Sequence, residues 1–199
     1  MKNFWNDRFS TQEYAYGEEP NEFFKIEISK ISQAGKILLL GEGEGRNANY
    51  AAQLGWTVDA VDWSEEGKRK AEILARKNNL IFNYSVFDLR QYTPQIGLYD
   101  VVGLIFLHFE EEIREQIHKK AIESLRVGGK IILEAYDKSQ LGKSSGGPQE
   151  LDLLYSLEDI VNDFSELEFE EFSQETVYLN EGKFHIGDAS VIRFVGTKK

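Results

Sequence analysis

The sequence predicts an α/β protein with a doubly wound, Rossmann-like sheet of seven mostly parallel strands and helices on both faces. Short apolar runs alternate with helical patterns through most of the chain, and this alternation is typical of a parallel sheet. Within each run the apolar residues are largely consecutive and do not alternate with polar ones, as expected of strands buried on both faces. The last two strands lack a helical crossover between them, so the sheet should end with an antiparallel last strand.

Five apolar runs supply the strands of the parallel part of the sheet. They span residues 36–40, 57–62, 81–88, 99–106 and 130–135. The first run stops at a glycine, and the next two end in aspartates. Because the carboxyl ends of parallel strands lie at one edge of a sheet, we expect these three strand ends to be neighbours.

Helical patterns fill the intervals between these runs. They cover residues 47–54, 64–78 and 110–125. Ser64 is a candidate N-cap, and the acids that follow it complement the helix dipole. In the last of these helices, apolar residues recur at a spacing of four, and a pair of glycines follows as a stop signal. His118 falls among its charged residues, so we expect it at the surface.

The last quarter of the chain is organised differently. Ser156 and Asp159 are spaced as a capping box that opens a short helix. Residues 167–178 and 189–197 follow as two strands, and about ten residues separate them, which is too few for a helical crossover. The glycine- and serine-rich stretch 137–149 is expected to be a flexible loop.

Length and composition indicate one globular domain over residues 1–199. Hydrophobic residues make up 41% and aromatic residues 13% of the chain, which excludes intrinsic disorder of the whole. No apolar run approaches the roughly 18 residues that cross a bilayer, and the N-terminus lacks a signal peptide's apolar stretch, so we expect a cytoplasmic protein with no membrane partner. Cysteine is absent, which excludes disulfides and thiolate chemistry. The net charge of −11 argues against nucleic acid as a partner.

The strongest motif is the glycine-rich segment 40–47, Leu-Gly-Glu-Gly-Glu-Gly-Arg-Asn, which follows a strand and opens a helix. Glycines here allow positive φ and close approach of the backbone to a ligand, although a tight turn without a ligand uses them too. Asp62, about twenty residues on, can accept hydrogen bonds from both hydroxyls of a ribose. Asp88 can meet the edge of an adenine. Together the three strand ends indicate a nucleoside site.

Arg46 argues against a dinucleotide as the ligand. The NAD fingerprint needs a third glycine at this position, where the helix packs against a strand. The Gly-x-Gly-x-Gly pattern also gives a wider turn, which suits a ligand without a pyrophosphate. A metal has little support, because histidines and acids do not cluster at ligand spacing.

These motifs resemble those of class I S-adenosylmethionine (SAM)-dependent methyltransferases. Segment 40–47 resembles motif I, and the other matching segments are 58–64 (ribose), 87–89 (adenine), 99–108 (fourth strand) and 125–130 (turn before the fifth strand). The resemblance covers essentially the whole chain. Its Gly-Arg-Asn version of motif I is most similar to the small-molecule branch, with the tellurite-resistance-type and thiopurine-type enzymes. It implies SAM as cofactor, S-adenosylhomocysteine (SAH) as product, and in-line methyl transfer to a small-molecule acceptor.

The resemblance also implies roles for individual residues. The cofactor would contact Gly41, Glu42, Gly43, Arg46, Asp62, Trp63, Asp88, Leu89 and Phe106. The catalytic residues would be His185, His108 and Tyr16. Other interpretations stay open for some of these, with Trp63 and Phe106 as ordinary packing aromatics and Asp88 as a helix N-cap.

Two positions depart from the family pattern. The family often has an acid two residues before the first glycine, and here that residue is Leu39, so its contacts must come from elsewhere. Glu42 stands where a small residue or cysteine is common, and its carboxylate would pair with the ammonium group of the cofactor or face water. Arg46 would meet the carboxylate of the cofactor or a surface acid.

Residues 1–30, which include Tyr14 and Tyr16, are expected to form a helical lid over the cofactor. The acceptor atom, the need for a general base, and the choice between monomer and homodimer stay open. Two alternatives to small-molecule methyl transfer remain. One is a non-catalytic module that binds SAM or SAH and regulates a partner, and the other is a methyltransferase that acts on a protein.

Overall fold

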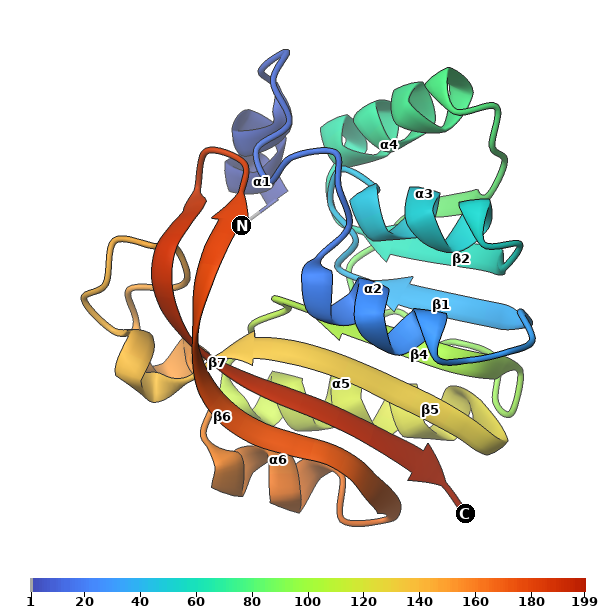
Figure 1. Cartoon of the computed structure of the whole chain (residues 1–199), viewed down its shortest axis with the longest axis vertical. Helices are drawn as coiled ribbons and strands as arrows, with labels where there is room; N and C mark the ends of the chain where they lie inside the picture. The colour runs from blue at the N-terminus through green and yellow to red at the C-terminus, as the bar shows by residue number, and fades with distance from the viewer. Residues whose placement is uncertain (1) are drawn as a thin grey trace.

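The computed structural model describes residues 2–199, which fold around one seven-stranded sheet (Figure 1). The helices are α1 (Lys2–Phe9), α2 (Glu22–Ser29), α3 (Arg46–Gln53), α4 (Glu65–Lys77), α5 (Glu111–Ser124) and α6 (Leu157–Asp163), with short 3-10 turns η1 (Lys138–Gln140) and η2 (Leu151–Leu153). The strands are β1 (Lys36–Leu40), β2 (Thr57–Asp62), β3 (Asn83–Val86), β4 (Tyr99–Ile105), β5 (Leu125–Tyr136), β6 (Leu167–Glu181) and β7 (His185–Lys198). No helix within residues 2–199 is both long enough and apolar enough to span a bilayer.

The order of the strands is β3-β2-β1-β4-β5-β7-β6. The first five strands along the chain pair in parallel, whereas β7 runs antiparallel to both β5 and β6. This confirms the predicted fold class. The chain passes from β1 outward to β2 and β3, and then returns to β4 on the other side of β1. Ligands of open α/β sheets bind at the carboxyl ends of the strands beside such a switch point.

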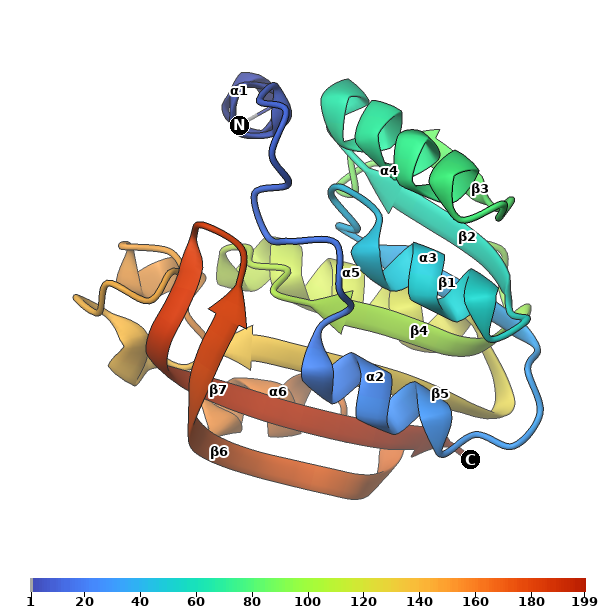
Figure 2. The same ribbon diagram turned by 45° about the horizontal axis from the view of Figure 1, so that its top comes forward.

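Helices cover both faces of the sheet, as predicted. Figures 1 and 2 show α2, α3 and α4 over one face and α5 and α6 over the other. Along β1, Ile37 and Leu39 belong to the apolar cluster that includes Phe24 of α2, while Leu38 and Leu40 belong to the cluster beneath α5 and α6. The continuous apolar run of this strand therefore reflects burial on both sides.

The last two strands form a longer hairpin than the sequence predicts. They are joined by residues 182–184 only, and Gly182 adopts the positive φ that this tight connection requires (φ 64°). The hairpin curls away from the sheet, and its tip lies beside the segment that follows α1 (Figure 2). This curl carries residues near 181–185 to the carboxyl edge of the parallel strands.

Stretch 137–149 is tied to the sheet by buried hydrogen bonds. Gln140 is fully buried, and its amide donates to Ser145 Oγ and to the Gly146 carbonyl, both at 2.9 Å. Its side-chain oxygen accepts the Ser190 N–H of β7 at 2.8 Å. These contacts hold Gly146 close to Phe184 and His185, at the start of β7.

The prediction that His118 lies at the surface is wrong. His118 is 2% exposed, and its Nδ1 lies 2.6 Å from Asp163 Oδ2. Arg114, one turn earlier on α5, also binds Asp163, at 2.7 Å. The physical reason is that α6 packs across α5, and its last residue pairs with both basic side chains. This tertiary contact is not visible in the charge pattern of α5 alone.

Candidate active site

The glycine loop between β1 and α3 is built on backbone conformations that favour glycine. Gly41, Gly43 and Gly45 have φ of 70°, 61° and 86°. Gly45 occupies the N-cap position of α3 and has no side chain to cap it. Glu42 caps the helix instead, because its Oε1 accepts the Ala48 N–H at 2.7 Å. The loop thus presents its backbone at the N-terminus of a helix, a place suited to ligand binding.

Glu42 does not face water. It is 8% exposed, and burial raises the pKa of its carboxyl to about 7, although the backbone N–H of Ala48 and the charge of Arg46 oppose this shift. The water-facing alternative is therefore wrong. Pairing with the ammonium group of a cofactor stays a prediction.

Asp62 joins the glycine loop to the start of α4. Its Oδ2 accepts the Gly43 N–H at 3.0 Å and its Oδ1 accepts the Ser64 N–H at 2.8 Å. Burial raises the pKa of Asp62, and these backbone bonds partly offset that effect. The carboxylate is therefore fixed at the end of β2, directly beside the loop.

Asp88 and Trp63 are brought together by Arg90. The guanidinium lies 2.6 Å from Asp88 Oδ2 and 4.7 Å from the centre of the Trp63 ring. Hydrogen bonds from Arg90 are the main reason that the pKa of Asp88 is lowered. The residues that directly follow Asp88 form a turn and not a helix, so the N-cap alternative is wrong. Leu89, 6% exposed, packs in the core below.

Arg46 pairs with Glu181, an acid whose side chain is only 11% exposed. Its Nη2 lies 2.9 Å from Glu181 Oε2 at the end of β6, and its Nη1 donates to the Tyr16 carbonyl at 3.2 Å. Asn21 also donates to Glu181, at 3.0 Å. Burial acts to raise the pKa of Glu181, but the bonds from His185 and Arg46 outweigh it and lower the pKa to about 2. Glu181 is therefore a carboxylate at neutral pH.

Three of the predicted residues meet in one aromatic cluster. The His185 ring centre lies 4.4 Å from that of Tyr16 and 4.8 Å from that of Phe106. Phe106 follows β4 and has a φ of 51°, a strained value for a side chain of this size. Tyr136, at the end of β5, stacks on Phe106 at 4.6 Å. The cluster thus joins the N-terminal segment, two strand ends and the hairpin.

The two histidines near this edge differ in the nitrogens they leave free. His185 Nδ1 lies 3.3 Å from Glu181, and its Nε2 makes no hydrogen bond within residues 2–199. His108 uses both nitrogens, because Nδ1 lies 2.8 Å from the Leu153 carbonyl and Nε2 accepts the Tyr136 N–H at 3.3 Å. Burial lowers the pKa of both rings, that of His108 to about 4. Both are therefore neutral at pH 7.

The chain matches the family described as "Tellurite resistance protein TehB" over residues 3–176. It belongs to the TehB family.

The curated relatives of the chain carry the same family name. It is 28% identical over 111 residues to the "Probable S-adenosyl-L-methionine-dependent methyltransferase TehB" of two Haemophilus influenzae strains, 10810 and Rd. The aligned part covers 55% of this chain and 39% of each relative, so the match spans less than half the length of those proteins. These names agree with the prediction of a methyltransferase that uses SAM.

Solved structures show the fold that this TehB-family chain shares. The crystal structure of TehB from H. influenzae superposes with a TM-score of 0.76 at 20% identity, over 100% of this chain and 67% of that one. A geranyl diphosphate C-methyltransferase from Streptomyces coelicolor A3(2), with SAH bound, superposes with a TM-score of 0.71 at 12% identity. The superposition covers 100% of this chain and 96% of that one. At these identities the likeness establishes the fold.

Two residues of the candidate site, Glu181 and Tyr136, are not predicted from the sequence. Glu181 precedes His185 by four residues across the turn at Gly182, and a hairpin of correct length would have placed the two side by side. Tyr136 ends the fifth strand, at the same edge as the motifs already recognised. The pairing of Glu181 with Arg46 joins residues 135 positions apart and had no local signal.

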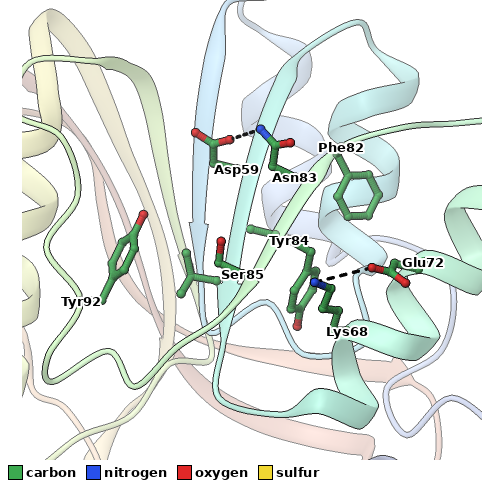
Figure 3. Close-up of a pocket in the computed structure, with 10 residues that line it drawn as sticks. Asp59, Lys68, Glu72, Phe82, Asn83, Tyr84, Ser85 and Tyr92 are labelled. Atoms are coloured by element: carbon green, nitrogen blue, oxygen red, sulfur yellow. Dashed lines mark hydrogen bonds and ion pairs between the residues drawn. The ribbon is translucent and has the colours of Figure 1, made fainter.

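Two cavities of the TehB-family chain are lined in part by sequence neighbours of predicted site residues. One of about 540 Å³ runs along the β2–β3 edge, where polar side chains including Asp59 and Lys68 line it (Figure 3). Another of about 580 Å³ lies between the N-terminal segment and the hairpin tip, near Arg8 and Phe184. None of the predicted site residues lines either cavity.

The glycine loop itself lies beneath the N-terminal segment. A Cβ placed on Gly43 would lie 3.3 Å from the Phe9 ring. The Ala15 N–H donates to Glu44 of the loop at 2.7 Å. Residues 9–16 therefore cover the loop in this structure.

Proposed function

We propose that this chain transfers a methyl group from SAM to a small-molecule acceptor by in-line displacement. The observation that carries the proposal is the bond between the glycine loop and Asp62, which accepts the Gly43 N–H at 3.0 Å and so sits beside the loop at the end of β2. Membership of the TehB family supports the same activity. The curated relatives are longer than the matched part, so their activity is carried to this chain as a proposal.

The residues at this edge fit the cofactor. Each oxygen of Asp62 accepts one backbone N–H, which leaves a lone pair on each oxygen for the two hydroxyls of a ribose. Trp63, directly after β2, and Asp88, just beyond the end of β3, would contact the adenine. The backbone of Gly41 and Gly43 would line the methionine part.

The acceptor side of the site centres on His185. When bound, SAM supplies an electrophilic methyl group on a sulfonium sulfur. His185 Nε2 takes the proton of a protic acceptor, and Glu181 holds the ring through Nδ1 so that Nε2 stays available. Arg46 keeps Glu181 ionised and oriented. Tyr16 and Phe106 pack against the imidazole and exclude water from it.

His108 has a positioning role in this proposal. Both of its ring nitrogens already bond to backbone groups, of Leu153 and Tyr136, so it has no free lone pair to offer an acceptor. It holds the end of β5 against residues 151–153. His185 rather than His108 is therefore the proposed base.

We also propose that residues 1–30 supply the lid of this site through the part that precedes α2, because Phe24 of α2 is anchored in the core. Phe9 covers the glycine loop and Tyr16 covers His185, so the part before α2 must move for ligands to enter. A space closed by the chain's own N-terminal segment suits a small acceptor better than a protein side chain.

Transfer of a labelled methyl group from SAM tests the proposal. The panel contains thiols, selenite, tellurite, amines and phenols, and we expect label in at least one of them. Binding of SAH with no transfer to any member would support a non-catalytic module. Tight binding of NAD without binding of SAM would refute the cofactor assignment.

A further inference from the structure

Tyr136 carries a buried hydroxyl that the fold does not use. The residue is 1% exposed, and its Oη has no hydrogen-bond partner within residues 2–199. Leaving a buried hydroxyl unpaired destabilises a fold, so such a group calls for a functional explanation. The nearby Tyr155 provides the contrast. It is also 1% exposed, but its Oη donates to the Leu107 carbonyl at 2.9 Å and accepts the Phe109 N–H at 3.1 Å.

The hydroxyl of Tyr136 lies beside the free edge of His185. The two rings are perpendicular, with centres 5.5 Å apart. A Cβ placed on Gly146 would lie 2.8 Å from Tyr136 Oη and 2.7 Å from His185 Cδ2. Because Cδ2 is bonded to Nε2, the hydroxyl and the proposed base share one small region. Gly146 has a φ of 115°, so its backbone approaches both groups without a side chain between them.

The hydroxyl is a donor at every physiological pH. Burial raises the pKa of Tyr136, and the charge of Glu181 raises it further. His185 is neutral, and its Nδ1 faces Glu181, so its Nε2 carries a lone pair. The region around Gly146 therefore offers one hydrogen-bond donor and one proton acceptor, and the rings of Phe106 and Tyr16 pack against the two residues that carry them.

Resting on the proposed methyl transfer, we propose that Tyr136 Oη binds the methyl acceptor by donating a hydrogen bond to an oxygen that lies within two carbons of its nucleophilic atom. The nucleophile forms its bond to the methyl carbon, its proton passes to His185 Nε2, and the electron pair of the broken carbon–sulfur bond stays on the departing sulfur. Acceptors that carry such an oxygen are selected, because only they pair the buried hydroxyl.

The test compares Tyr136→Phe with Tyr155→Phe. Loss of the unpaired hydroxyl is expected to leave Tm unchanged or raise it, whereas loss of the paired hydroxyl of Tyr155 should lower Tm by about 5 °C. Calorimetry should give the same SAH affinity for Tyr136→Phe and the wild type.

Two probes of equal shape then report on the hydroxyl. NMR titration follows 2-mercaptoethanol and 1-propanethiol binding to the SAH-loaded protein, so no turnover is needed. Tyr136→Phe should weaken the binding affinity for 2-mercaptoethanol about five- to tenfold and leave the affinity for 1-propanethiol unchanged.

Several results would overturn the inference. One is a fall in Tm for Tyr136→Phe as large as that for Tyr155→Phe. Others are an equal change in affinity for both probes, or no change in affinity for 2-mercaptoethanol, when Tyr136→Phe is compared with the wild type. The last is failure of both probes to bind the SAH-loaded wild type. Failure of the proposed function is seen separately, as a wild type that does not bind SAH or transfers no label to any member of the acceptor panel.

Discussion

Removal of the Lys70 ammonium should destabilise the fold strongly. Lys70 Nζ lies 2.5 Å from Glu44 Oε1, and both side chains are 3% exposed. The ammonium also donates to the Glu13 carbonyl at 2.6 Å. Lys70→Met leaves the Glu44 carboxylate buried without its cation and removes the hydrogen bond to Glu13 of the N-terminal segment. Breaking a buried pair in this way costs about 3–5 kcal/mol, which is about 6–20 °C in Tm for a chain of this size.

Lys68→Met is the matched control, two residues earlier on the same helix. Its ammonium lies 3.8 Å from Glu72, and the two side chains are 38% and 46% exposed, so its loss should cost about 0.5 kcal/mol or less. Urea unfolding and calorimetry measure both variants. The double variant Glu44→Gln/Lys70→Met should recover part of the loss, because no unpaired charge remains. Equal stability of Lys70→Met and Lys68→Met would refute the reasoning.

Two further predictions concern carboxylates of the site. The pKa of Glu42 rises from 4.5 to about 7 on folding, so the folded state holds this proton between those pH values and the wild type loses about 3 kcal/mol as pH rises through them. Glu42→Gln lacks this titration. In urea unfolding, the free energy of unfolding of Glu42→Gln relative to that of the wild type should therefore increase by about 3 kcal/mol over this pH range. Parallel curves of unfolding free energy against pH for the two proteins would contradict the prediction. Asp62→Asn should weaken the affinity for SAH, measured by calorimetry, by about 100-fold. Asp59→Asn, three residues earlier on β2, should change this affinity by less than about threefold. Equal SAH affinities of the two variants would place the ribose elsewhere.

The sheet could be predicted because its signals are local. The strands of the parallel part are short apolar runs, and the first three of these runs end at a glycine or an acid. Residues such as Leu38 and Leu39 are apolar since both faces are covered. Ser156 and Asp159 form the predicted capping box. The convergence of Gly43 and Asp62 followed from the rule that parallel strands end at one edge.

The parts that could not be predicted depend on contacts between distant segments. His118 has charged neighbours in sequence, yet α6 buries it against Asp163. Arg46 finds Glu181 only because the long hairpin brings the end of β6 to the start of α3. The unpaired hydroxyl of Tyr136 depends on the packing around it, which no pattern of residue types encodes.

The most direct test of the central claim is to measure SAH formation and labelled product together when the wild-type protein is incubated with labelled SAM and the acceptor panel. We expect one molecule of SAH for each methyl group that appears on a small molecule. SAM bound with no SAH formed and no labelled acceptor would contradict it.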